Sequence, residues 1–187
     1  MFKHILSGRL NMAKHNVLFE TDNFIPSCIN RGGIATVDID GGTALAIGDY
    51  DAKDKELYTV TKAAVNAKRV AIAFNPSVKY DIIGDNLYPA RSKDDRNYTN
   101  PAKHPLDFFI PTVDIEFGIL AHGIKGSAPT KGQYLEPTVD GWTAKGAQTD
   151  SVASFKVVDI VDSAKYPTFN FDDDTEKVYI LKTVFNG

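Results

Sequence analysis

The sequence predicts a mainly β protein, a small β-barrel or sandwich with long irregular loops and little helix. Short runs of residues alternate apolar and polar side chains, which is the pattern of a strand with one buried face. Glycine, proline, asparagine and aspartate separate these runs at short intervals. Such spacing is typical of a sandwich or barrel, whereas parallel sheets alternate strands with longer helical segments.

Individual strands follow from the same pattern. The runs cover residues 33–39, 43–47, 57–61, 69–74, 113–119, 133–136, 155–161 and 177–184. The last two are the strongest, because they are long and rich in β-branched residues. Asp-Gly-Gly at 40–42 predicts the tight turn of a β-hairpin between the first two, since aspartate and glycine tolerate a positive φ. Residues 62–68 carry helix formers over a length that allows a single turn of helix, and periodicity alone does not separate helix from strand across 57–74.

We expect an N-terminal arm at residues 1–15, a β-rich lobe at 16–112 and a β-barrel-like lobe at 113–187, the last two forming either separate lobes or one continuous domain. Residues 84–111 carry turn formers, charges and tyrosines. An irregular segment of this length is usually disordered or functional, and its tyrosines argue against disorder. It is therefore predicted to be an ordered contact loop. Basic residues interrupt any signal-peptide core near the N-terminus, so residues 1–11 form a peripheral arm or precede a second start at Met12.

Composition argues against several classes of protein. The 187 residues carry a formal net charge of −3, without the basic stripe that a nucleic-acid-binding protein uses to neutralise phosphates. No apolar run approaches the roughly 18 residues that cross a bilayer. Cys28 is the single cysteine, which excludes an intrachain disulfide. It lies in a short apolar stretch, where a buried structural thiol is the expected outcome and a nucleophile is not.

The motifs of catalytic and metal sites are missing, so we expect no enzyme, no cofactor and no metal. Asp38 and Asp49 each begin a run like a calcium-binding loop, but neither run has an oxygen ligand at its fifth position or glutamate at its twelfth. Asp172, Asp174 and Glu176 are read as a solvated acidic face, since unpaired carboxylates prefer water. The four histidines lack ligand spacing, and no nucleophile elbow or Walker loop occurs. A pair of carboxylates for glycoside hydrolysis remains an open alternative, because the fold and not the sequence spacing brings such residues together.

The C-terminal part resembles a known family. The similarity lies in residues 131–137 (KGQYLEP), 141–143 (GWT), 154–160 (SFKVVDI) and 178–184 (VYILKTV). These strand and turn motifs resemble small head-associated proteins of tailed bacteriophages, across roughly residues 113–187. The resemblance implies a capsid decoration (cement) protein, made in the host cytoplasm and located on the capsid surface of the virion. Its partners would be the major capsid protein and neighbouring copies of itself, and the family brings no catalytic residues.

Aromatic and arginine side chains are the candidate interface residues, because Tyr, Phe and Arg are enriched at protein interfaces. The candidates are Tyr88, Arg91, Arg96, Tyr98, Phe108 and Phe109. Phe108 and Phe109 fit an ordinary core equally well.

Two other functions stay open. One is a different virion component (tail, baseplate or head fibre) that binds a host surface or carbohydrate. The other is a hydrolase or carbohydrate-binding module on a β-sandwich. A receptor-binding protein is expected to show an exposed aromatic platform, and a capsid clamp to bury residues 84–111 and the arm against neighbouring copies. An enzyme is expected to show a concave pocket with convergent titratable groups.

Overall fold

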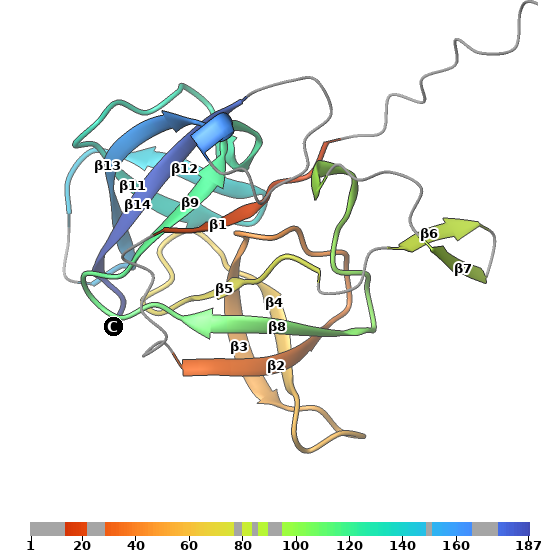
Figure 1. Ribbon diagram of the computed structural model, residues 1–187. Coiled ribbons are helices and arrows are strands. Elements are labelled where there is room, and N and C mark those ends of the chain that lie inside the picture. The colour runs from red at the N-terminus through yellow and green to blue at the C-terminus, as the bar shows by residue number, and fades with distance from the viewer. Residues whose placement is uncertain are drawn as a thin grey trace, which may run out of the picture.

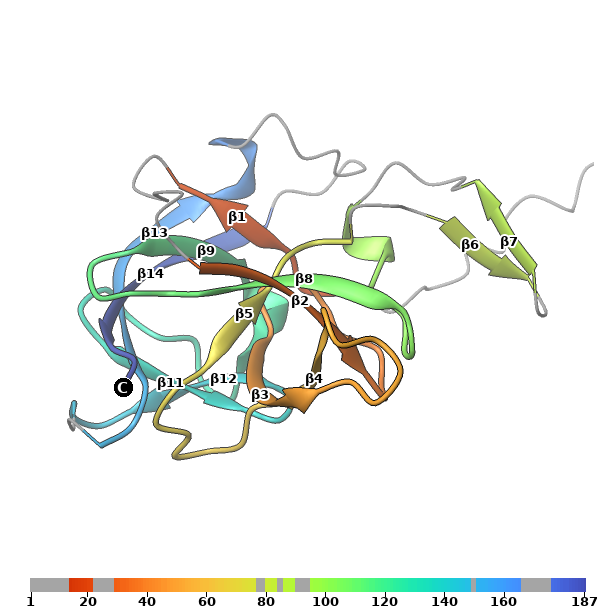
Figure 2. The same cartoon turned by 90° about the horizontal axis from the view of Figure 1, so that it is seen from below.

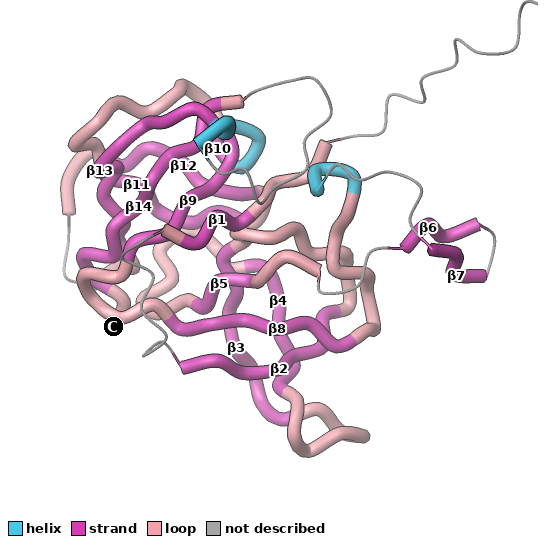
Figure 3. The backbone as a smooth tube through the Cα atoms, viewed as in Figure 1, coloured by secondary structure: helices cyan, strands magenta, loops and turns pink. Residues whose placement is uncertain are grey.

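The computed structural model describes residues 14–21, 29–76, 80–83, 86–89, 95–148, 151–165 and 176–187. Strands dominate this part of the chain (Figure 3), which confirms the predicted mainly β class. The strands are β1 (Leu18–Glu20), β2 (Ile29–Ala35), β3 (Ala44–Tyr50), β4 (Tyr58–Lys62), β5 (Ala71–Ala73), β6 (Tyr80–Ile83), β7 (Asn86–Pro89), β8 (Pro105–Ile110), β9 (Glu116–Leu120), β10 (Ile124–Lys125), β11 (Tyr134–Thr138), β12 (Gly141–Lys145), β13 (Ser154–Asp162) and β14 (Lys177–Phe185). Three short 3-10 helices accompany them, η1 (Asp95–Asn97), η2 (Ala121–Gly123) and η3 (Ser163–Lys165).

Five strands close into a barrel in the order β2-β4-β3-β5-β8, in the lower part of Figure 1. The pair β2–β4 is parallel and the other pairs are antiparallel. Buried side chains such as Leu45, Val60 and Phe108 fill the barrel. A side chain at Gly33 would place its Cβ 2.9 Å from Val60 and 3.0 Å from Phe108, so glycine leaves these two side chains room inside the barrel.

The hairpin predicted across residues 33–47 is wrong in its pairing. Both runs form strands, but β4 lies between β2 and β3 in the barrel. A turn does form at 40–43, where the Thr43 N–H donates to the Asp40 carbonyl and Gly42 has a φ of +72°. Before it, fully buried Ile39 exchanges two backbone hydrogen bonds with Asn100, of 2.9 and 2.8 Å. Ile39 is thus held by a contact from a distant part of the chain, which a local turn motif does not reveal.

A seven-stranded sheet has the order β1-β9-β14-β13-β11-β12-β10 and lies above the barrel in Figure 1. The two strongest predicted strands became β13 and β14, which pair side by side in antiparallel fashion. The chain passes from the barrel into this sheet between Ile110 and Glu116. β1 precedes the barrel strands in the sequence, yet it pairs with β9 at the edge of the sheet. Segments from both ends of the chain therefore build this sheet.

The barrel and the sheet lie against each other (Figure 2), and one hydrophobic core joins them. Phe109 of the barrel contacts Phe117 of β9, with ring centroids 5.9 Å apart. Phe117 in turn contacts Trp142 at 5.9 Å, and Trp142 meets Phe155 edge-on at 4.9 Å. The indole N–H of Trp142 donates a 2.9 Å hydrogen bond to the Gly42 carbonyl, in the turn before β3. A continuous aromatic row thus couples the two sheets.

Other segments depart from the expected loops and helix. Residues 62–68 contain a turn with Asn66 at a φ of 65°, and no helix. Within the predicted contact loop at 84–111, β7 pairs with β6, which lies just before the loop, and β8 is a strand of the barrel. Figure 1 shows β6 and β7 beside the two main sheets. None of the helices in the described ranges is long and apolar enough to span a bilayer.

Candidate functional site

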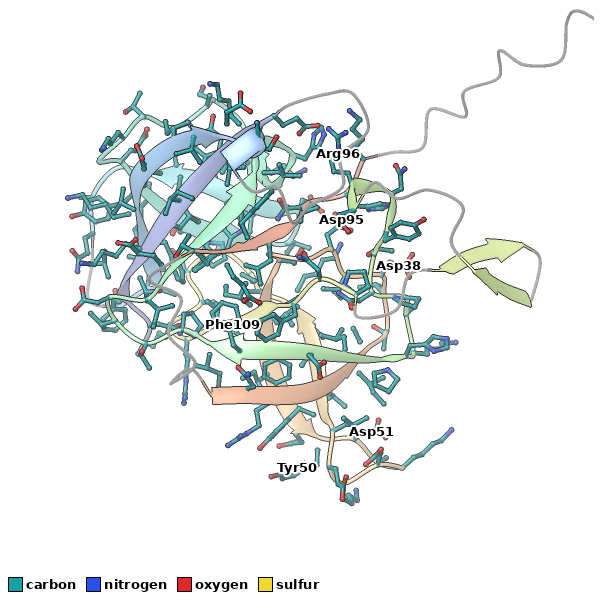
Figure 4. The ribbon with its side chains drawn as sticks, in the orientation of Figure 1. Asp38, Tyr50, Asp51, Asp95, Arg96 and Phe109 are labelled. Atoms are coloured by element: carbon teal, nitrogen blue, oxygen red, sulfur yellow. The ribbon has the colours of Figure 1, made fainter. Side chains whose placement is uncertain are left out.

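Tyr50 is an exposed aromatic side chain at the end of β3, next to the loop that joins β3 to β4 (Figure 4). Its relative exposure is 53%. In the described part of the chain, the exposed large hydrophobic side chains are Tyr50 and four valines. Tyr50 is therefore the aromatic residue of this set. An exposed aromatic ring at a sheet end is the feature expected of a ligand-binding surface.

Tyr50 lies on a stack of rings that reaches into the barrel core. It faces Tyr58 of β4 across a register shift between Ile47 and Tyr50, and the two rings stack with centroids 4.5 Å apart at 24°. Tyr58 meets Phe108 edge-on at 6.3 Å, and Phe108 is fully buried. Core packing therefore fixes Tyr58, and Tyr58 in turn supports the Tyr50 ring.

The two phenol groups are hydrogen-bonded to each other. The hydroxyl oxygens of Tyr50 and Tyr58 are hydrogen-bonded at 3.0 Å. This bond raises the pKa of Tyr50 above its ordinary value, although the positive charge of Arg31 on β2 acts in the opposite direction. Tyr50 thus keeps its proton at neutral pH.

The loop beside Tyr50 is ordered by its own hydrogen bonds. The Asp51 carboxylate accepts the backbone N–H groups of Lys53 at 2.8 Å and Asp54 at 3.0 Å. Both backbone hydrogen bonds lower the pKa of Asp51, and the bond from Asp54 has the larger effect. The Asp51 N–H donates to the Leu57 carbonyl at 2.8 Å, which closes the base of the loop. Tyr50 and Tyr58 together are called the aromatic platform below, and this charged, ordered loop forms one rim of it.

A second polar feature, the Glu176 junction, lies well apart from Tyr50, near the labelled Arg96 in Figure 4. The Glu176 carboxylate contacts Arg96 of η1 at 2.5 Å, Lys14 at 3.5 Å and His122 of η2 at 3.3 Å. Arg96 has a relative exposure of 1%. The Glu176 backbone is held at Ser163, whose hydroxyl accepts its N–H at 3.0 Å. Side chains from three other segments thus meet at the Glu176 carboxylate, and Ser163 holds its backbone.

Beside this junction, the N-terminal segment forms an ion pair with the loop before β3. His15 Nδ1 lies 2.8 Å from Asp40 Oδ1, and the Asn16 N–H donates to the other carboxylate oxygen at 3.2 Å. The hydrogen bond with Asp40 raises the pKa of His15 against the effect of burial. Burial alone would raise the pKa of Asp40, but its bonds and charge interaction with His15 and its bond from Asn16 outweigh burial and lower it.

This pair predicts a pH-dependent stability. The stabilisation from His15 is complete below its unfolded pKa of 6.5 and is lost as the pH rises through its raised folded pKa. The stabilisation from Asp40 is present above 3.8 and is lost as the pH falls through its lowered folded pKa. Urea denaturation of His15→Gln is expected to show a loss of about 0.5–1 kcal/mol near pH 5, where both groups are charged, and little loss near pH 9.

His104→Gln is the matched control, because His104 is an exposed loop residue. An equal loss for His15→Gln at both pH values would contradict a role for the charged imidazole.

The structure places most of the predicted interface residues inside the chain. Phe108 and Phe109 are fully buried strand residues, which agrees with the core alternative. Arg96 is 1% and Tyr98 5% exposed, so the expectation that they are surface anchors is corrected. Their own chain covers them, because η1 packs against the N-terminal segment and Glu176. The backbone of Tyr88 lies in β7, and its side chain is outside the described residues, as are the calls made on Arg91, Cys28, Asp172 and Asp174.

Glu176 was expected on a solvated acidic face together with Asp172 and Asp174. Its side chain is instead 14% exposed and contacts Lys14, Arg96 and His122. Sequence inspection missed this because its partners lie at positions 14, 96 and 122. It also missed the aromatic platform, whose signal was a tyrosine at each end of a short charged segment, residues 50 and 58.

The aspartates that resemble calcium-loop ligands have other partners here. Asp38 accepts the Ala102 N–H at 2.8 Å, Asp40 pairs with His15, and Asp51 binds its own loop. Within the described ranges, no group of three or more His, Cys, Asp or Glu side chains is arranged to hold a metal ion.

Comparison with known proteins gives few matches. No protein-family model matches the sequence, and no curated protein matches it. Among solved structures, the fold is similar to the crystal structure of the N base of the head fiber gp8.5 of bacteriophage phi29. The alignment has a TM-score of 0.42 and 11% sequence identity, and it covers 86% of this chain and 99% of that chain. A likeness this distant carries no evidence on function.

Proposed function

We propose that this chain is a structural protein of a tailed-bacteriophage particle that binds the outer capsid shell between capsomers as a decoration protein. The proposal includes no catalysis, no cofactor and no metal. Its main support is where the motifs that resemble head-associated proteins fall. They lie on β11, β12, β13 and β14, which are neighbours in one sheet in the order β14-β13-β11-β12. Motifs dispersed over about a third of the sequence thus belong to one folded unit.

Anchoring of the N-terminal segment also supports a clamp. The Asn75 side chain bonds both backbone groups of Leu18, accepting its N–H at 2.7 Å and donating to its carbonyl at 2.8 Å. The Asn16 side chain accepts the Leu120 N–H at 3.0 Å, and β1 pairs with β9. Lys14 and His15, which were assigned to the arm, are held by Glu176 and Asp40. A load applied to residues before 14 would therefore pass into the folded body.

In this function the chain would act through binding energy alone. A protein that bridges neighbouring capsomers stabilises the assembled shell by mass action, because it binds that state and not the separated subunits. Many copies multiply a modest stabilisation per copy. The partners proposed are the major capsid protein and neighbouring copies of this chain.

Particle stability tests the proposal. The purified chain is expected to bind particles that lack it and to raise the temperature at which they release their genome. The measurement is a thermal release assay with increasing amounts of protein, with denatured chain as the control. Unchanged release temperature at saturating addition would contradict capsid decoration.

A second candidate function is an external virion component, such as a tail, baseplate or head-fibre protein, that binds a host surface. The observation that favours it is the exposed Tyr50 platform at the barrel end, a feature that a pure clamp does not require.

A further inference from the structure

We propose that the barrel end around Tyr50 binds a carbohydrate, with one face of a sugar ring stacked on the outer face of the Tyr50 ring. This inference deepens the second candidate function and rests on it for the source of the sugar. The binding itself is a property of the isolated chain and can be measured without a virion.

The first argument is that Tyr50 does more than close the barrel. Tyr58 already covers the barrel core at this end, since it packs on buried Phe108 and belongs to the edge of that core. Tyr50 lies beyond Tyr58, with one face stacked on it and 53% of its surface exposed. Little further core is left for Tyr50 to bury, so its exposed face is available to a ligand.

The second argument is preorganisation. Stacking at 4.5 Å and the hydroxyl bond at 3.0 Å hold Tyr50 against Tyr58 at two points. Cross-strand pairing of the two residues also fixes their backbones. A ligand that stacks on this ring therefore immobilises few additional rotamers, and less of its binding free energy is lost to ordering.

The third argument is the polar rim. A phenol hydroxyl both donates and accepts hydrogen bonds, so the Tyr50 hydroxyl keeps a hydrogen-bonding site for a ligand hydroxyl beyond its bond with Tyr58. Arg31 lies close enough to Tyr50 for its charge to affect the phenol and is itself exposed. Exposed Asp49 and Lys53 lie in the segments that flank the ring. One apolar ring face surrounded by donors and acceptors matches a pyranose, which presents C–H groups on its face and hydroxyls around its edge.

A protein partner fits this surface less well. Protein hot spots consist of clustered apolar and aromatic side chains in a patch that excludes water. The four exposed valines of the described residues lie in other segments, at positions 37, 65, 113 and 139. Tyr50 is thus one ring among charges of both signs, which suits a small polyhydroxyl ligand.

Saturation-transfer NMR with the full chain and a panel of methyl pyranosides tests the inference. The panel contains the glucoside, galactoside, mannoside and N-acetylglucosaminide. At least one is expected to bind at millimolar concentration, with transfer concentrated on the C–H protons of one ring face. Tyr50→Ala is expected to raise the Kd about tenfold or more, whereas Tyr50→Phe keeps most of the affinity.

Tyr134→Ala is the matched control, because Tyr134 is a half-buried tyrosine on β11 whose ring lies near Lys156. Circular dichroism checks that each variant is folded. Absence of binding by every glycoside, or equal binding by Tyr50→Ala, would overturn the inference, as would self-association of the chain through Tyr50 in sedimentation experiments. Attachment of the same variant to particles is measured separately, so loss of glycan binding with intact attachment would leave the virion proposal standing.

Discussion

Trp142→Ala is expected to lower the free energy of unfolding by about 3–5 kcal/mol, the cost typical of truncating a large buried aromatic side chain. Trp142 is fully buried at the centre of the row formed by Phe117 and Phe155. This loss is a large part of the total free energy of unfolding of a domain, which is roughly 5–15 kcal/mol. Urea denaturation followed by far-UV circular dichroism measures it, with the wild-type chain under the same conditions.

Trp142→Phe separates packing from hydrogen bonding at this position. Phenylalanine keeps much of the buried area but cannot donate to the Gly42 carbonyl, which Trp142 reaches at 2.9 Å. The expected cost is about 1–3 kcal/mol, because a buried carbonyl loses its partner and a smaller ring leaves space. Since that carbonyl lies before β3, the variant should also loosen the contact between sheet and barrel. Equal costs for the alanine and phenylalanine variants would contradict the packing argument.

Strand positions were predictable because they depend on local pattern. Residues 155–161 and 177–184 alternate or continue apolar side chains over a long run, and they form β13 and β14. Residues 57–61 likewise correspond to β4. Period-2 burial is a property of neighbouring residues and is therefore visible in the sequence itself.

Strand partners were not predictable in the same way. The Asp-Gly-Gly turn suggested that two neighbouring strands pair, but β4 separates them through a parallel contact with β2. After β2, buried Ile39 bridges to Asn100, 61 positions away, so the connection between β2 and β3 is held by contacts from outside the local turn. Free energy from such long-range contacts overrides a local turn preference.

The candidate sites show the same division. Aromatic and arginine residues at 96–109 looked like interface anchors, yet whether a phenylalanine is core or surface depends on the rest of the fold. Phe108 supports the aromatic platform from below and does not form its surface. Glu176 acquires its role from Lys14, Arg96 and His122, which come from other segments. A single sequence shows the residue types, and folding decides which of them meet.

Arg96→Met is expected to destabilise the chain by about 2–4 kcal/mol, because it removes the buried cation of the Glu176 junction. Arg96 is almost fully buried, and the Glu176 side chain is 14% exposed. Breaking a buried ion pair leaves a desolvated charge without its main partner, which costs more than the pair itself contributes. Lys14 and His122 remain near the carboxylate and keep the cost below that of a fully orphaned charge.

A double-mutant cycle with Glu176→Gln isolates the pair. The double variant is expected to be more stable than the sum of the two single losses predicts, by about 1–3 kcal/mol, because residues in one ion-pair network are coupled. Lys182→Met is the matched control: Lys182 contacts Asp114 at 2.7 Å on the surface, where an ion pair contributes about 0–1 kcal/mol. Additive losses at Arg96 and Glu176 would contradict the coupling. Because the junction holds Lys14, the Arg96 variant should also expose the N-terminal segment to trypsin faster than the control does, which links this junction to the proposed clamp.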